Sequence, residues 1–133
     1  MTNQLTDSQR KWYDLAAMHA DDFALRAAQH DADNSYPFEN MDALRESGYT
    51  SMPIPADMGG GGASLLEVCI AQNRLAQGDG ATALAVNMHF GLPYVMCDLI
   101  KAGDDHPRPL LEKIARSEER RVGKACRSRW APY

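Results

Sequence analysis

Residues 64–79 read SLLEVCIAQNRLAQGD, and this stretch decides how the rest of the chain is interpreted. Ser64 and Glu67 have the capping-box spacing of a helix N-terminus, in which each side chain bonds the other residue's backbone N–H. Gly78 ends this helix, whose apolar positions include Leu65, Leu66, Cys69, Ile70 and Leu75. Asp79 then stands where it can cap a further helix. The stretch therefore predicts two consecutive helices joined by a short turn.

The residues before this stretch show the same pattern twice. Thr6 and Gln9 form another capping-box pair at the start of a helix that we expect to end near Gln29. Its small and apolar residues recur at three- or four-residue intervals, as Trp12, Ala16, Ala20, Phe23 and Ala27. Ser35 can cap a second, short helix with Pro37 in its first turn. The apolar face of that helix is Phe38, Met41 and Leu44.

The residues after this stretch predict further helices. Residues 81–90 are rich in Ala, Leu and Val and form the first of them. Gly91 and Pro93 should break or kink it, because proline removes a backbone donor and clashes with the preceding turn. More helices are expected at about 94–102 and at 107–116. The sequence shows no convincing strand, so it predicts an all-α helical bundle of about five to six helices.

One long connection is irregular. Residues 49–62 contain two prolines and the glycine run Gly59–Gly62, and they support no helix. Four glycines before a helix N-terminus could cradle an anion. However, the run lacks the Lys-Ser/Thr of a P-loop and the preceding strand of a dinucleotide fold. We therefore expect a flexible connector.

Composition bounds the class of protein. The chain has 133 residues, of which 44% are hydrophobic and 24% charged, as in ordinary globular proteins. Its 14 basic and 18 acidic residues give a net charge of -4, so there is no reason to invoke nucleic acid. The chain opens without a secretory signal pattern. Neither a disulfide framework nor a CxxC metal site is formed by its three cysteines, Cys69, Cys97 and Cys126. We expect a cytoplasmic protein.

The most apolar stretch, residues 83–100, is a poor membrane span. It is interrupted by Asn87, His89, Pro93 and Asp98. We therefore expect no membrane span.

Charge is uneven along the chain. Residues 1–116 carry 9 basic and 16 acidic residues, whereas residues 117–133 carry 5 basic and 2 acidic ones. The second segment has no apolar pattern and is interpreted as a solvated basic tail or a nucleic-acid arm. It also resembles SEERRVGKECRSRWSPY, a peptide translated from sequencing-adapter DNA, and departs from it only at Ala125 and Ala131. We therefore predict a helical domain at 1–116 and a non-native or disordered tail at 117–133.

Candidate catalytic residues are few. No metal-ligand spacing relates the histidines to one another or to a cysteine; they are His19, His30, His89 and His106. The adjacent pairs Asp21–Asp22 and Asp104–Asp105 point apart, so they are interpreted as solvating charge rather than an acid–base dyad. The residues themselves therefore supply no nucleophile, general base or metal site.

The order of these features resembles the amino-terminal helical domain of the acyl-CoA dehydrogenase superfamily. The matching segments are QHDADNSYPFENMDALRESGY (29–49), PIPADMGGGG (53–62), EVCIAQNRLAQGD (67–79) and ATALAVNMHFG (81–91). The resemblance covers residues 5–116, nearly the whole helical part. Gly61 departs from the family pattern, which more often has a side chain between these glycines, so a looser loop is expected.

The resemblance implies a flavoprotein of fatty acid metabolism. It removes the α proton of an acyl-CoA thioester with a carboxylate and passes the β hydride to FAD. An electron-transfer acceptor and a homo-oligomer, either tetramer or dimer, are implied as well. The catalytic carboxylate and most flavin contacts of the family lie downstream, beyond Arg116, so no catalytic residue is assigned. The family's acyl-chain pocket is lined by the helix at 81–90, so the candidate substrate-binding residues are Ala83, Leu84, Asn87 and Met88.

Two alternatives stay open. A flavin-dependent monooxygenase or nitroalkane-oxidase-like relative would share the fold, and His89 beside Asn87 would suit its flavin–oxygen adduct. His89 is accordingly a candidate flavin-side residue. A non-enzymatic helical interaction module would instead need helices whose apolar faces satisfy one another, and the apolar content of residues 81–100 is large for that. The chain by itself is expected neither to hold FAD stoichiometrically nor to oxidise an acyl-CoA.

Overall fold

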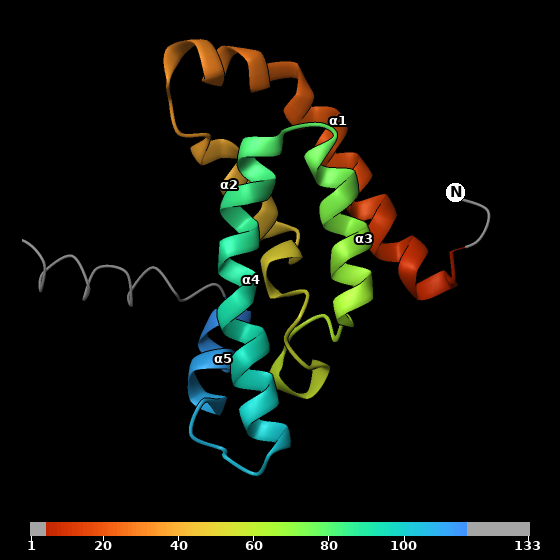
Figure 1. The fold of residues 1–133 in the computed structure, drawn as a ribbon, viewed down its shortest axis with the longest axis vertical. Helices are drawn as coiled ribbons and strands as arrows, with labels where there is room; N and C mark the ends of the chain where they lie inside the picture. Colours follow the sequence, from red (N-terminus) through yellow and green to blue (C-terminus); the bar gives the residue numbers. More distant parts are fainter. Residues whose placement is uncertain (1–4, 117–133) are drawn as a thin grey trace, which may run out of the picture.

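The computed structural model describes residues 5–116 and shows an all-α fold (Figure 1). Its α-helices are α1 (Asp7–Asp33), α2 (Phe38–Glu46), α3 (Leu65–Ala76), α4 (Gly80–Lys101) and α5 (Arg108–Ala115). Two short 3-10 helices, η2 (Tyr49–Ser51) and η3 (Ala56–Met58), lie between α2 and α3. The described residues contain no strand, so the predicted all-α bundle is confirmed. The tail predicted at 117–133 lies outside the described residues.

Three of the predicted helix starts, those of α1, α3 and α4, are confirmed by their caps. The capping boxes at Thr6 and Ser64 are both complete. The Asp79 carboxylate caps α4 by accepting hydrogen bonds from the Ala81 and Thr82 N–H groups at 3.0 and 3.2 Å. Each cap of this kind contributes ~1 kcal/mol and satisfies N–H groups that the helix leaves open. Local chemistry therefore sets where α1, α3 and α4 begin.

The end of α1 and the start of α2 differ from the prediction. α1 continues beyond Gln29 to Asp33, and Asn34 ends it with a left-handed φ of 49°, which Asn tolerates better than most residues. Ser35 does not cap α2, because its hydroxyl lies 2.8 Å from His30 Nδ1. α2 accordingly begins without a side-chain cap. The N-cap position of α2 is Pro37, so this proline precedes the first turn instead of standing in it as predicted.

The predicted break at Gly91 and Pro93 is wrong, because α4 is one continuous helix. A proline inside a helix costs ~3 kcal/mol through the lost N–H donor and crowding of the preceding turn. Pro93 is buried, however, and so are Val86, Phe90 and Cys97 on the same helix. Burying each large apolar side chain contributes ~1.5–3 kcal/mol. Tertiary packing of an unbroken helix therefore outweighs the local cost of the proline.

Two apolar clusters hold the helices together. The larger joins α1, α2, α3 and α4 through side chains that include Phe23, Leu44, Leu75 and Val86. The smaller joins the α2–α3 connection to the C-terminal half of α4 and to α5 through Ile54, Met58, Cys97, Leu111 and Ile114. In Figure 1, α3 lies beside the upper half of α4 and α5 beside its lower half. The upper pair, α3 and α4, forms the walls of the candidate site.

The glycine run is closely packed, so the expectations of a flexible connector and of a looser loop at Gly61 are wrong. A Cβ on Gly60 would lie 2.2 Å from the Ile54 carbonyl oxygen, and one on Gly61 would lie 2.5 Å from the Trp12 ring. Each N–H of the run donates to a backbone carbonyl within residues 51–56, at 2.8 to 3.1 Å. These N–H groups are therefore not available for an anion.

α4 is long and apolar enough to cross a membrane by length and composition alone. Of its most apolar window, 33% is buried inside the structure. A core helix meets the same test, so one helix of this kind is weak support for a membrane span.

Candidate functional site

A groove of about 620 Å³ lies between α3 and α4. Three of its lining residues are buried and apolar or aromatic, namely Val68 from α3 and Ala83 and Phe90 from α4. Polar side chains line it as well, among them Gln72 and Asn87. A concave surface with apolar walls and a few polar groups is the usual composition of a small-molecule site. The groove is therefore the candidate site.

Three of the four predicted substrate-binding residues line this groove. Ala83 is buried, whereas Leu84 and Asn87 are exposed. Met88 is 76% exposed and does not line the groove. The structure thus brings Ala83, Leu84 and Asn87 together along one wall and leaves Met88 outside. Their role in substrate binding stays a prediction.

His89, the predicted flavin-side residue, does not line the groove. Its Nε2 lies 3.0 Å from the Thr50 carbonyl oxygen in η2, and its ring centroid lies 5.9 Å from that of Phe90. A carbonyl only accepts hydrogen bonds, so Nε2 carries the proton and donates it. Both His89 and the N–H groups of the glycine run are thus bonded to the chain's own backbone. The N–H groups of the glycine run are therefore not free to hold a flavin phosphate, and a flavin-side role of His89 stays a prediction.

Gln72 links the two walls of the groove. Its Nε2 donates to the Ala83 carbonyl oxygen at 3.0 Å, and its Oε1 accepts from the Tyr49 hydroxyl at 2.9 Å. Tyr49 is fully buried, and this burial raises the pKa of its hydroxyl far above the ordinary value. The hydroxyl therefore stays protonated and keeps donating. The sequence pattern marks neither residue, because Gln72 is one of several polar residues of α3, beside Asn73 and Arg74.

Tyr94 places an unsatisfied hydroxyl near the groove. The residue lines the groove, and its hydroxyl oxygen is buried without a hydrogen-bond partner among residues 5–116. Burial, with smaller contributions from nearby Cys69, Cys97 and Glu67, raises the pKa of this hydroxyl to about 12. An unpaired buried polar group costs ~1–3 kcal/mol. Tyr94 is thus a polar group that the described part of the chain leaves unsatisfied at the site.

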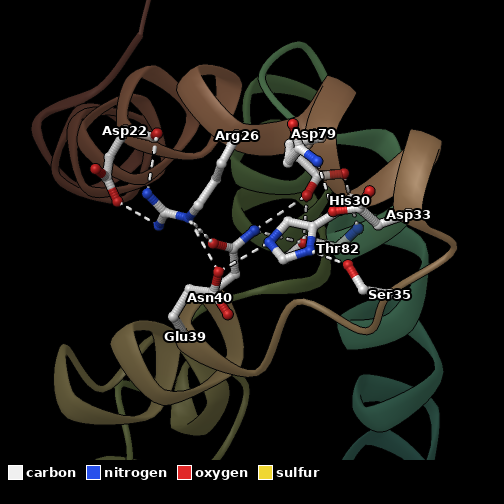
Figure 2. Close-up of polar contacts among 10 residues, drawn as sticks. Asp22, Arg26, His30, Asp33, Ser35, Glu39, Asn40, Asp79 and Thr82 are labelled. Carbon is white, nitrogen blue, oxygen red and sulfur yellow. Dashed lines mark hydrogen bonds and ion pairs between the residues drawn. The ribbon is translucent and has the colours of Figure 1, made fainter.

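A buried polar network holds the N-terminal end of α4 (Figure 2). Asn40 of α2 is fully buried, and its Nδ2 donates to Asp79 Oδ2 at 3.1 Å and to Thr82 Oγ1 at 3.0 Å. Its Oδ1 accepts from Arg26 Nε of α1 at 2.6 Å. Thr82 Oγ1 in turn donates to Asp79 Oδ2 at 2.6 Å. A single amide thus joins a cation on α1 to the carboxylate that begins α4.

The Asp79 carboxylate has all its acceptor positions in use. Oδ1 accepts from two backbone N–H groups, and Oδ2 accepts from Asn40 and from Thr82. A general base must lie within hydrogen-bond reach of a substrate proton with a lone pair directed at it. Asp79 does not meet this requirement, so its role is structural. Through it the network fixes the first turn of α4, which carries Ala83 and Leu84 into the groove.

Exposed ion pairs extend this network to the surface (Figure 2). Arg26 pairs with Asp22 at 2.6 Å, and this hydrogen bond lowers the pKa of the Asp22 carboxyl below its ordinary value. His30 Nε2 lies 2.9 Å from Glu39 Oε1, and its Nδ1 contacts Ser35. Such exposed pairs contribute only ~0–1 kcal/mol each. The Arg26–Asp22 pair lies within α1, whereas the His30–Glu39 pair ties α1 to α2.

Metal chemistry has no site in the part of the chain that the structure describes. Residues 5–116 contain no group of three or more His, Cys, Asp or Glu side chains that could hold a metal ion. The apolar walls of the groove and its few polar groups support binding of a partly apolar molecule.

The fold and the groove define a helical domain with a binding surface between two adjacent helices. The family model described as "Acyl-CoA dehydrogenase, N-terminal domain" matches residues 6–118. The chain therefore belongs to the acyl-CoA dehydrogenase family and contains its N-terminal domain. The resemblance stated from the sequence motifs is confirmed.

Curated relatives support this membership. The chain is 40% identical over 86 residues to a protein of Bacillus subtilis (strain 168) whose name is "Putative acyl-CoA dehydrogenase YdbM", covering 65% of this chain and 23% of that protein. It is 31% identical over 117 residues to a 3-sulfinopropanoyl-CoA desulfinase of Variovorax paradoxus, covering 78% of this chain and 29% of that protein. It is 27% identical over 121 residues to the amino sugar nitrososynthase RubN8 of Streptomyces rubradiris, covering 90% of this chain and 29% of that protein. The matched part thus spans 23 to 29% of these relatives. No solved structure gives a significant match.

Proposed function

We propose that this domain belongs to a longer flavoprotein oxidoreductase that catalyses FAD-dependent α,β-dehydrogenation of an acyl-CoA thioester. The observation that carries the proposal is the family match over residues 6–118, which includes both walls of the groove. The similarity to YdbM supports the same reaction class. We further propose a cytoplasmic homo-oligomer that passes electrons to an electron-transfer acceptor and serves fatty acid metabolism.

In this proposal the groove between α3 and α4 receives part of the acyl group. Ala83 and Phe90 offer apolar surface, and burying an acyl chain against such surface is favourable by ~0.8 kcal/mol per methylene. Leu84 extends this surface outward, and Asn87 adds one polar contact. Met88 stands beside Leu84 on the exposed side of α4 and contacts the substrate only if the site extends beyond the groove.

The residues described here bind and orient; the proton-abstracting carboxylate is proposed to lie in the longer polypeptide. The buried carboxylate of Asp79 directly precedes α4, but its acceptor positions are already filled. FAD would supply the hydride acceptor, and its contacts are proposed to lie outside residues 5–116 as well.

The test uses the longer protein expressed from its uninterrupted gene. Flavin absorbance after adding octanoyl-CoA should bleach, and Leu84→Asn should raise the KM for octanoyl-CoA more than it lowers kcat, since it removes apolar binding surface. Leu25→Asn is the matched control, because Leu25 is 85% exposed on α1 and does not line the groove. Absence of bleaching with acyl-CoA of any chain length would sink the proposal.

The 133-residue chain gives a second test. Purified with added FAD, it should not retain flavin stoichiometrically, because most flavin contacts are proposed to lie outside residues 5–116 and the N–H groups of the glycine run are already bonded to backbone carbonyls. Binding must first offset an association cost of ~4–15 kcal/mol. Near one bound flavin per chain, bleached by acyl-CoA, would contradict both the proposed location of the flavin contacts and the absence of a catalytic residue here.

One observation favours a second function, the flavin-dependent monooxygenase or nitroalkane-oxidase-like relative. The similarity to RubN8 covers 90% of this chain, whereas the similarity to YdbM covers 65% of it. Nitrososynthase names a reaction other than dehydrogenation of a CoA thioester. Oxygen consumption by the longer protein separates the two functions: rapid uptake of oxygen on turnover favours the monooxygenase, and its absence with a supplied electron acceptor favours the dehydrogenase.

A further inference from the structure

A second cavity lies beyond one end of the groove. The groove follows α4 from Gly80 to Tyr94, and the second cavity, of about 560 Å³, follows the same helix from Tyr94 to Lys101. At the rise of an α-helix these two stretches are ~21 and ~10 Å long. The opposite wall of the second cavity comes from the α2–α3 connection, which includes Pro53 and Ala63. The two cavities thus follow one another along α4.

Two residues line both cavities, Leu65 at the start of α3 and Tyr94 on α4. The Leu65 side chain is 62% exposed, whereas Tyr94 packs against the larger apolar cluster and buries its hydroxyl oxygen. Burial and, to a smaller extent, nearby Cys69 and Cys97 raise the pKa of this hydroxyl. Cys69 lines the groove and Cys97 lines the second cavity, so the hydroxyl lies close to both. Tyr94 therefore separates the two cavities from the inside.

The hydroxyl of Tyr94 does not stabilise the domain. It has no hydrogen-bond partner among residues 5–116, and leaving a buried donor unpaired costs free energy. The hydroxyl of Tyr49 is also buried, but it donates to Gln72 Oε1 at 2.9 Å. Phenylalanine at position 94 would place the same ring without this cost. The Tyr94 ring is therefore held by packing in a position that its hydroxyl disfavours, and each adjoining cavity offers space into which it can turn.

We propose that Tyr94 is a partition that sets the length of the acyl chain which the groove accepts. This inference rests on the proposed function, because that function places the acyl group in the groove. A chain that ends before Tyr94 stays within the groove, whereas a longer chain enters the second cavity only by displacing the ring. Packing against the apolar cluster opposes this displacement, and release of the buried hydroxyl favours it. Tyr94 thus discriminates between chains by their length.

The second cavity suits the far end of an alkyl chain. Pro53, Ala63 and Cys97 give it apolar surface. Among the described residues that line it, the only charged ones are Asp98 and Lys101, which pair with each other at 3.1 Å. Neither charge is therefore left without a partner that a charged ligand would have to supply. An alkyl chain is the occupant that this lining favours.

The experiment compares kcat/KM for octanoyl-, dodecanoyl- and hexadecanoyl-CoA in the longer protein. Tyr94→Ala removes the partition, so kcat/KM for hexadecanoyl-CoA relative to octanoyl-CoA should rise at least about tenfold, the scale on which apolar pockets discriminate between chains. Tyr94→Phe keeps the ring and should change this ratio less than about threefold. The matched control is Tyr36→Ala, because Tyr36 is 49% exposed and lines neither cavity. It should leave the ratio unchanged.

Thermal unfolding of the longer protein distinguishes the partition from a purely structural role. Tyr94→Phe should raise the melting temperature, because it removes an unpaired buried hydroxyl and keeps the ring. A purely structural loss in Tyr94→Ala would lower kcat/KM for all three esters by the same factor and leave the ratio unchanged. If Tyr94→Ala does not fold, Tyr94→Leu shortens the side chain while keeping it apolar, and the ratio should rise in that variant too.

An unchanged ratio in a folded Tyr94→Ala or Tyr94→Leu protein overturns the inference. An equal change in Tyr94→Phe and Tyr94→Ala also overturns it, because the hydroxyl and not the ring would then discriminate. Calorimetric titration with the three esters gives the same comparison as a ratio of dissociation constants, without turnover. A protein that binds the esters but does not oxidise them contradicts the proposed function, while the effect of Tyr94 on chain length is still measured. Failure to bind any of the esters overturns both.

Discussion

The N-terminal end of α4 and its outer face are built in opposite ways. At the N-terminal end, Asn40, Asp79 and Thr82 satisfy one another's hydrogen bonds inside the domain. Along the outer face, Leu84, Met88 and the apolar side chains beyond them have no covering element among residues 5–116. The first region stabilises the domain, whereas the second contributes little to its stability because its side chains stay exposed. Function is therefore to be sought where the domain leaves surface unsatisfied.

Removing the amide of the polar network should have the largest effect on stability. Asn40→Leu preserves volume but deprives Arg26 Nε and Asp79 Oδ2 of their shared partner. Each charge keeps its other partners, so the loss is that of hydrogen bonds to charged groups, which contribute ~1.5–3 kcal/mol each. Urea unfolding of the 133-residue chain should show this as a lower midpoint. As a control, Asn73→Leu at an exposed position should lower the free energy of unfolding by less than ~0.5 kcal/mol. Equal losses of unfolding free energy in Asn40→Leu and Asn73→Leu would mean that the buried network does not stabilise the domain.

A smaller loss of stability is expected when a side chain is added at a glycine that packs closely against the backbone. In Gly60→Ala the new Cβ would sit 2.2 Å from the Ile54 carbonyl oxygen, so the loop must shift at a cost of ~1–3 kcal/mol. Gly91→Ala adds the same methyl group to open space on α4 and should stabilise the helix by ~0.5–1 kcal/mol. Thermal unfolding of both variants measures the difference, and a stabilised Gly60→Ala chain would show that the loop is loose after all.

His19 should make stability depend on pH. It is buried beside Phe23 and Tyr49, with Nε2 2.7 Å from Ser47 Oγ. Burial lowers its pKa below the ordinary 6.5, although Asp22 partly opposes this. The unfolded chain therefore binds a proton first as pH falls, so the contribution of neutral His19 is complete above pH 6.5 and declines below it.

Urea unfolding at pH 7.5 and at pH 5.5 measures this decline. His19→Gln should flatten the difference between the two pH values, while His106→Gln, at an exposed position, should retain it. A wild-type midpoint that does not change over this range would contradict a buried neutral His19.

The helix starts could be predicted from the sequence because capping boxes are local, as at Thr6 and Ser64. The continuity of α4 could not, because burial around Pro93 outweighs a local rule. The partners of Asn40 lie 39 and 42 residues away, so spacing offered no signal for the polar network. Ala83, Leu84 and Asn87 were identified as groove residues through family resemblance, since nothing in their types alone marks a binding site.

The smallest effect is expected on the exposed apolar side of α4, at Leu84. Leu84 is 67% exposed in the domain, so Leu84→Gln removes little buried apolar area and should change the unfolding free energy of the 133-residue chain by less than ~0.5 kcal/mol. Val86→Ala, two residues further along the same helix, removes a fully buried side chain and should cost ~2 kcal/mol. Urea unfolding of the two variants compares the two sides of α4 directly. A loss above ~1 kcal/mol in Leu84→Gln would show that the outer face stabilises the domain itself, and the contrast with the polar N-terminal end of α4 would no longer hold.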